Sequence, residues 1–136
     1  MNTNERNLGE TMINIITGSR ITRVKLSDIE VVEQEGRKLH IMTAKEDYPC
    51  YASIESVKDQ LLLEENFYQP MKKLIINFSK IKEIVDGEII FVSGSSLCMG
   101  RNTFIETRKA FKDYIRSYPG MMSAGGGMNF SERKKR

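Results

Sequence analysis

The residues best suited to chemistry in this chain are basic residues at predicted turns. Lys72 and Lys73 stand just before the apolar run 74–76, and Arg101 follows a Gly-Ser loop and precedes a predicted helix. Basic side chains at loop tips are what a protein needs to reach phosphates and base edges in the groove of a nucleic acid. Residues 67–101 therefore predict that loops of a small β-rich module bind a polyanion.

The sequence contains little that indicates an enzyme. No nucleophile–base pair, metal-ligand cluster or phosphate-binding loop is visible, and the chain has one histidine, His40. On an alternating strand, this histidine is expected to be half-buried and structural. Cys50 and Cys98 are too few and too far apart for a metal site or a disulfide framework, so both are expected to be small buried hydrophobic residues. We therefore expect no enzyme activity, no catalytic or metal-binding residues and no cofactor.

Length and composition indicate one domain with a hydrophobic core. The chain has 136 residues, of which 40% are hydrophobic and 29% charged. No apolar run approaches the ~20 residues that span a bilayer, and residues 1–19 lack a basic region followed by an apolar stretch. The expected compartment is therefore cytoplasmic.

Charge is distributed unevenly along the chain. Residues 1–100 carry 12 Lys or Arg against 15 Asp or Glu, a balance of −3, and residues 101–136 carry 9 against 3, a balance of +6, which together give the net charge of +3. A basic C-terminal part predicts a polyanionic partner. The alternative is a solvated helix face followed by a basic tail.

The first half of the chain predicts short strands. Residues 1–20 are expected to be a loose lead-in with room for one short strand. Alternation of apolar and polar residues predicts strands at 23–26, 28–34, 37–43 and 48–51. In the second of these, Ile29 and Val31 are expected to share one face. The last should lie at a sheet edge, because Pro49 donates no backbone hydrogen bond.

The second half predicts two helices with a hairpin between them. Ser53 is expected to cap the first helix with its hydroxyl, and Thr103 with Glu106 to form a capping box for the last helix. Asp86-Gly87 predicts a hairpin with a type I′ turn. The stripe along the last helix is expected to contain Phe104, Arg108, Phe111 and Ile115.

Several segments, in order, resemble the LytTR-type DNA-binding domain, the output module of many bacterial response regulators. The matching segments are DIEVVEQEGRKLHI, YASIESVKDQL, FYQPMKKLIINFSKIKEI and SSLCMGRNTFIETRKAFKDYI. The chain departs from the family pattern at Gln69 and Met71, where Arg and His are frequent, at Lys72-Lys73 in place of Arg-Ser, and at Gly100, where Ser usually precedes the loop arginine. These departures concern base preference more than DNA binding itself.

The resemblance implies a mostly β (α+β) fold, a compact domain of several short antiparallel sheets with two small helices. We expect this domain at residues 21–118, after a flexible or partly ordered lead-in at 1–20 and before a disordered, Gly-rich basic tail at 119–136. The implied function is a sequence-specific transcriptional regulator that binds double-stranded DNA through loops in the major groove.

The resemblance also implies which residues contact DNA. Arg101 is the expected base reader, because a guanidinium fork can pair with guanine; the alternative is a structural arginine paired with an acidic neighbour. Lys72 and Lys73 are expected to clamp phosphates, the alternative being two solvated lysines. Arg37 and Lys38 lie where the family places its other contacting loop, although a charged hairpin tip would have the same sequence.

Other polar residues have smaller expected roles. Asn102 is expected either to contact DNA or to cap the last helix, and Asn77 to bond the backbone locally. Residues 133–136 are expected to be a weak, disordered phosphate arm. Long-range attraction is expected from Arg108, Lys109, Lys112 and Arg116.

About 20 residues precede the expected domain, which leaves no room for the receiver domain of typical family regulators. The resemblance therefore implies a stand-alone regulator, controlled by its abundance, by homodimerisation on repeated half-sites, or by a membrane-protein inhibitor. The alternative function is a small β-rich protein–protein interaction module that offers a sheet edge to its partner.

Overall fold

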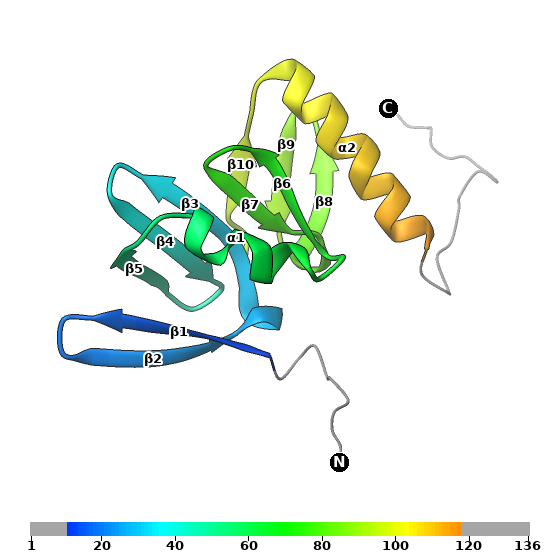
Figure 1. The fold of residues 1–136 in the computed structure, drawn as a ribbon. Coiled ribbons are helices and arrows are strands. Elements are labelled where there is room, and N and C mark those ends of the chain that lie inside the picture. Colours follow the sequence, from blue (N-terminus) through cyan, green and yellow to red (C-terminus); the bar gives the residue numbers. More distant parts are fainter. Residues whose placement is uncertain (1–10, 118–136) are drawn as a thin grey trace, which may run out of the picture.

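The computed structural model describes residues 11–117, which form a mostly β fold of three antiparallel sheets and two α-helices (Figure 1). The largest sheet has the strand order β5-β4-β3-β7-β6. Its strands are β3 (Ile29–Glu35), β4 (Lys38–Thr43), β5 (Asp47–Tyr51), β6 (Phe67–Met71) and β7 (Leu74–Asn77). The expected fold class is confirmed.

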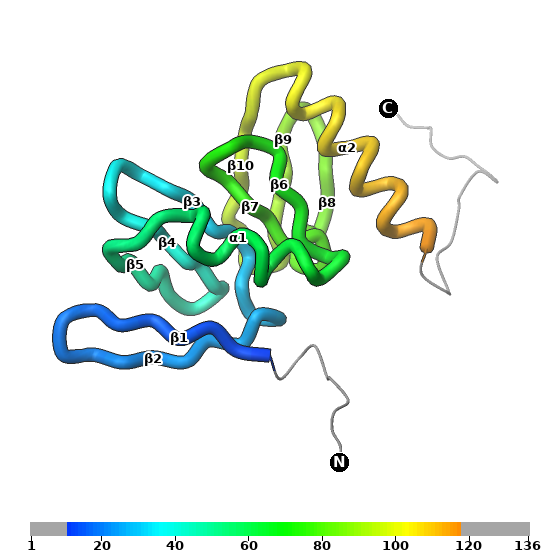
Figure 2. The backbone as a smooth tube through the Cα atoms, in the orientation of Figure 1, coloured from blue at the N-terminus to red at the C-terminus, as the bar shows by residue number. Residues whose placement is uncertain are grey.

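The remaining elements flank this five-stranded sheet. A hairpin consists of β1 (Met12–Thr17) and β2 (Arg20–Lys25). The three-stranded sheet contains β8 (Ile81–Val85), β9 (Glu88–Phe91) and β10 (Ser96–Cys98). The helices are α1 (Glu55–Leu62) and α2 (Arg101–Arg116), and the short 3-10 turns are η2 (Leu26–Asp28) and η3 (Phe78–Lys80). Figure 2 traces the chain from the hairpin through the five-stranded sheet to α2, which lies beside the three-stranded sheet.

The core has two parts, which lie on opposite faces of the five-stranded sheet. One cluster joins the hairpin and α1 to the sheet and includes Ile29 and Val32. The other joins the three-stranded sheet and α2 to it and includes Val31. The expectation that Ile29 and Val31 share a face is therefore wrong, because β3 has a bulge between these two residues that shifts its register.

Two turn and edge predictions are confirmed. Strand β5 lies at the edge of the five-stranded sheet, as Pro49 requires. Asp86 and Gly87 have φ values of 54° and 78° and join β8 to β9. Positive φ at both central residues defines the type I′ turn, which suits the twist of a two-residue hairpin.

Both helix caps predicted from the sequence are wrong. Helix α1 begins one residue later than a Ser53 cap would require, with Ile54 at its N-cap and no side-chain cap. Helix α2 begins at Arg101 with Gly100 as N-cap, so Thr103 and Glu106 lie inside the helix. Glycine is tolerated at an N-cap. With Gly100 as N-cap, the helix begins at Arg101, two residues before the expected capping box at Thr103.

The stripe expected along α2 is partly wrong. Phe104 and Phe111 pack against the second core cluster, but Arg108 is exposed. Its place on the buried face is taken by Thr107, which is fully buried and hydrogen-bonds Met99. A threonine among charged residues carries no apolar signal, which is why periodicity did not identify it.

The structure describes part of the expected N-terminal lead-in and none of the expected C-terminal tail. Strand β1 lies within the expected lead-in and pairs along its length with β2, and Ile13 and Ile15 are buried. The expected disordered tail and the basic residues 133–136 lie outside the described residues. No helix between residues 11 and 117 is long and apolar enough to cross a membrane.

Candidate nucleic-acid interface

Three of the basic residues singled out in the sequence meet at one surface groove. The groove has a volume of about 500 Å³ and is lined by Gln34, Gly36, Arg37, Ala52, Ser53, Ile54, Glu55, Lys72 and Lys73. Arg37 comes from the β3–β4 turn, and Lys72 and Lys73 come from the β6–β7 turn. We call this surface the basic groove.

The charge of the basic groove is available to a ligand. Arg37, Lys72 and Lys73 are all exposed, and within residues 11–117 none of them forms an ion pair. The one carboxylate in the lining, that of Glu55, lies 3.3 Å from Lys58 Nζ outside the groove. The groove therefore presents unneutralised cations to solvent.

Gln34 holds the walls of the basic groove together. Its Nε2 donates to the carbonyl oxygens of Gly36 at 3.0 Å and Ala52 at 3.0 Å, and its Oε1 accepts from the Ile54 backbone N–H at 2.5 Å. Its backbone N–H donates to the Lys73 carbonyl at 2.9 Å. One residue thus joins the β3–β4 turn, the β5–α1 connection and the β6–β7 turn. This role could not be predicted from the sequence, because the partners of Gln34 are up to 39 residues away.

The β6–β7 turn is braced by a residue that departs from the family pattern. Gln69 Nε2 donates to the Lys72 carbonyl at 3.1 Å. Strand β6 also has an irregular register between Tyr68 and Met71, directly before this turn. The side chain of Gln69 therefore shapes the loop that carries Lys72 and Lys73.

Lys38 is not part of the basic groove. Its Nζ lies 5.7 Å from the centroid of the Tyr51 ring, on the neighbouring strands β4 and β5. A cation over an aromatic face is a weak attraction at an exposed site. Lys38 is therefore engaged within the sheet, although it remains exposed.

Arg101 and Asn102 form a second exposed position, apart from the groove lining. Both are in the first turn of α2, where Gly100 precedes the helix in an extended conformation (φ −58°, ψ 156°). The helix is anchored by Phe104 and Phe111 against the second core cluster. Within residues 11–117, Arg101 forms no ion pair. Asn102 is not the cap, because Gly100 occupies that position.

The four basic residues expected to supply long-range attraction lie together on the outer face of α2. They line a shallow depression of about 310 Å³ with Ile105 and Asp113, and they are Arg108, Lys109, Lys112 and Arg116. The only nearby carboxylate in this lining, Asp113, lies 3.9 Å from Arg116 and is exposed. This face of α2 therefore has a net positive charge.

The histidine and the cysteines lie away from these basic surfaces. His40 is mostly buried and its Nδ1 lies 2.9 Å from Asp47, so the expected structural role fits the geometry. Cys50 is partly buried, and burial raises the pKa of its thiol. The prediction that both cysteines are buried is wrong for Cys98, which is exposed at the end of an edge strand. No cluster of three or more potential metal ligands occurs among the residues that the structure describes.

Comparison with known proteins points to one family. The profile of the LytTr DNA-binding domain matches residues 19–112. Among solved structures, the chain is similar to the LytTr DNA-binding domain of a Bacillus cereus protein described as a methyl-accepting/DNA response regulator. The TM-score is 0.61 at 17% identity, over 75% of this chain and 97% of that one. No curated protein matches the chain.

Proposed function

The chain belongs to the LytTr DNA-binding domain family, and from this premise we propose that it is a transcriptional regulator that reads specific sites with loops in the major groove. The observation that carries the proposal is the convergence of Arg37, Lys72 and Lys73 from two separate turns on one groove without acidic partners. Unpaired cations on exposed turns suit the regularly spaced phosphates of duplex DNA.

In this proposal the basic groove positions the protein on the DNA backbone. Lysine acts as a point charge and contributes affinity with little sequence information, so Lys72 and Lys73 are assigned to phosphates. Arg37, on the β3–β4 turn, is assigned to phosphates of the same DNA strand. Lys38 has a lesser share, because its ammonium is attracted to the Tyr51 ring.

Arg101 is the proposed base reader. It is exposed on the first turn of a helix that the core holds firmly, and its guanidinium has five donors in a planar fork. Such a fork can pair with O6 and N7 of guanine in the major groove. Asn102, beside it, is proposed to contact an adenine edge or a neighbouring phosphate.

Salt dependence tests this proposal. The logarithm of the duplex association constant should fall with the logarithm of salt concentration, with a slope of about −0.9 for each neutralised phosphate. Lys72→Gln and Lys73→Gln should each make that slope shallower by about 1. Lys82→Gln removes the same charge from an exposed site on β8, outside the groove, and should leave the slope unchanged. Failure of the wild-type protein to bind any duplex from its own upstream region at low salt would overturn the proposal.

A protein partner is the second candidate function. The specific observation is an exposed apolar pair on the hairpin, where Ile16 is 66% exposed and Ile21, its direct cross-strand neighbour, is 72% exposed. Homodimerisation on repeated half-sites and capture by a membrane-protein inhibitor would both use such a surface. In sedimentation titrations, the protein should occupy the two sites of a two-site duplex cooperatively, and Ile16→Ser/Ile21→Ser should remove the cooperativity. Independent binding of the wild-type protein to the two sites would rule out the dimer.

A further inference from the structure

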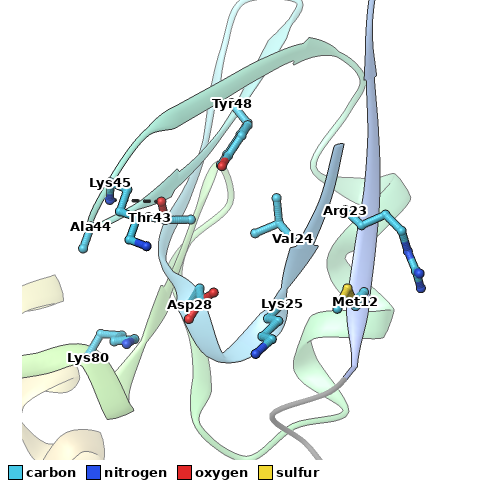
Figure 3. A pocket seen from close by; sticks show the side chains of 10 residues that line it. All are labelled: Met12, Arg23, Val24, Lys25, Asp28, Thr43, Ala44, Lys45, Tyr48 and Lys80. Carbon is cyan, nitrogen blue, oxygen red and sulfur yellow. Dashed lines mark hydrogen bonds between the residues drawn. The ribbon is translucent and has the colours of Figure 1, made fainter. Parts of the chain in front are cut away.

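A second concave basic surface lies at the opposite end of β4 from the basic groove. It is a pocket of about 450 Å³ between the β1–β2 hairpin, the β4–β5 turn and the 3-10 turns η2 and η3. We call it the hairpin pocket. Figure 3 shows Asp28, Lys45, Tyr48 and Lys80 around one hollow, with Val24 at its side.

Cations predominate in the hairpin pocket. Lys25, Lys45 and Lys80 come from three separate segments, namely β2, the β4–β5 turn and η3. Within the described part of the chain, none of the three has an ion-pair partner. Asp28 is the one carboxylate in the lining. These three ammonium groups therefore leave positive charge at one hollow, where an anionic ligand could contact it.

Arg23 also lines the pocket but is directed elsewhere. Its Nε donates to Asn14 Oδ1 at 3.2 Å on the neighbouring strand β1, and Figure 3 shows its guanidinium turned away from the hollow. Arg23 is therefore not among the proposed ligand contacts.

The walls of the pocket are held in place by hydrogen bonds. Thr43 Oγ1 accepts from the backbone N–H groups of Lys45 at 3.2 Å and Glu46 at 3.1 Å, which fixes the turn that carries Lys45. Arg20 on the hairpin donates to Glu46 Oε2 at 2.8 Å, and its guanidinium lies 5.4 Å from the centroid of the Tyr48 ring. The hairpin and the turn are thus fastened together at the side of the pocket.

The hairpin pocket is separated from the basic groove by the length of a strand. Strand β4 begins at Lys38, directly after the turn that carries Arg37, and ends at Thr43 in the pocket. Six residues in a strand span about 17 Å from first to last Cα. A strand of the wall, β1, also precedes residue 19, where the family match begins. The pocket is therefore a feature distinct from the proposed DNA contacts.

From these observations we infer that the hairpin pocket binds a small phosphorylated organic molecule. Its volume lies within the range of about 300–1,000 Å³ that is usual for small-molecule sites. Lysine ammonium groups suit phosphate oxygens, and the half-buried Tyr48 offers an aromatic surface for the organic part. A ligand bound there would contact both the hairpin and the β4–β5 turn. The position of the hairpin would then depend on the concentration of the ligand.

Titration of the full chain with inorganic pyrophosphate, followed by amide chemical shifts at constant ionic strength, tests the inference. Saturable shifts are expected at the amides of Lys25, Lys45, Tyr48 and Lys80. Lys45→Gln and Lys80→Gln should each weaken pyrophosphate binding about tenfold, because each removes one charge-assisted contact. Lys82→Gln, an exposed lysine on β8 outside the pocket, should leave binding unchanged.

Three results would overturn the inference. The first is the absence of saturable shifts at the pocket, and the second is an equal loss of pyrophosphate binding in Lys82→Gln. The third is that Lys45→Gln and Lys80→Gln lower duplex affinity as Lys73→Gln does, because these lysines would then serve the DNA backbone. Loss of duplex binding in the wild type, with pyrophosphate binding retained, would contradict the proposed function and leave the pocket in place.

Discussion

Two side-chain amides, those of Gln34 and Asn77, join segments that are far apart in the sequence. Asn77 is fully buried; its Nδ2 donates to the Ile29 carbonyl at 2.7 Å, and its Oδ1 accepts from the Ser79 N–H at 2.9 Å. The local bond was expected from the sequence, but the bond to Ile29, 48 residues away, was not. Satisfied buried amides specify one arrangement of the backbone, because each donor left unpaired is costly.

Replacing Gln34 tests this role at a single residue. Gln34→Ala would leave the Ile54 N–H and the Ala52 carbonyl unpaired, and we expect it to lower the free energy of unfolding by about 1–3 kcal/mol in urea denaturation. Gln60→Ala is the matched control, since Gln60 is exposed and makes one long bond of 3.4 Å; its effect should stay within about 0.5 kcal/mol. Equal effects of the two substitutions would show that Gln34 does not hold the groove.

The two cysteines should differ in reactivity. The thiolate is the reactive form, and burial raises the pKa of Cys50, so less of it is ionised at a given pH. Cys98 is exposed, so it should be alkylated by iodoacetamide before Cys50. Mass spectrometry of the two peptides over time measures the order. Modification of both at the same rate in the folded protein would contradict this placement of Cys50.

At the scale of elements, strands were easier to predict than helix ends. Alternation correctly indicated β4, with Leu39 and Ile41 buried, and the Asp86-Gly87 pair indicated its turn, because both signals are local. The bulge in β3 and the start of α2 depend on pairing and packing with distant residues. For the candidate site too, local features could be predicted and contacts between distant residues could not. The sequence identified Arg37, Lys72 and Lys73, but their meeting in one groove depends on Gln34 and the order of the strands.

The hairpin's attachment to the β4–β5 turn should depend on pH. The hydrogen bond from Arg20 lowers the pKa of Glu46 in the folded protein. The contact therefore stabilises the fold above the unfolded pKa of Glu46, and this contribution is lost as pH falls through the lower, folded pKa. The stability difference between wild type and Glu46→Gln should be largest above about pH 5 and disappear in stronger acid.

Urea denaturation of both proteins across that pH range measures this difference. Glu83→Gln is a suitable control, because Glu83 is exposed on β8 and forms no ion pair among residues 11–117. Its difference from wild type should change less with pH. A difference between wild type and Glu46→Gln that is independent of pH would show that the Arg20 contact does not stabilise the hairpin.

At the scale of the whole molecule, two basic concavities are built on opposite ends of β4. The basic groove lies at the β3–β4 turn, and the hairpin pocket lies at the β4–β5 turn. Helix α2 adds a separate position, Arg101, supported by the second core cluster. The proposed backbone contacts, base reading and ligand binding would therefore fall to different parts of one small domain.

The central claim is that Arg101 reads sequence while the basic groove supplies general affinity. It predicts that replacing Arg101 lowers affinity for the specific site and leaves affinity for unrelated duplex nearly unchanged. Arg101→Lys separates the fork from the charge, because lysine keeps the charge but has no planar pair of donors. Both variants should retain the fold, since Arg101 is exposed, and circular dichroism checks this.

The most direct test first locates a binding site by footprinting the region upstream of the gene. It then compares the binding of wild type, Arg101→Ala and Arg101→Lys to this site and to a scrambled duplex of equal length. We expect both variants to lose about 1–3 kcal/mol of discrimination between the two duplexes. Folded variants that discriminate as well as wild type would contradict it.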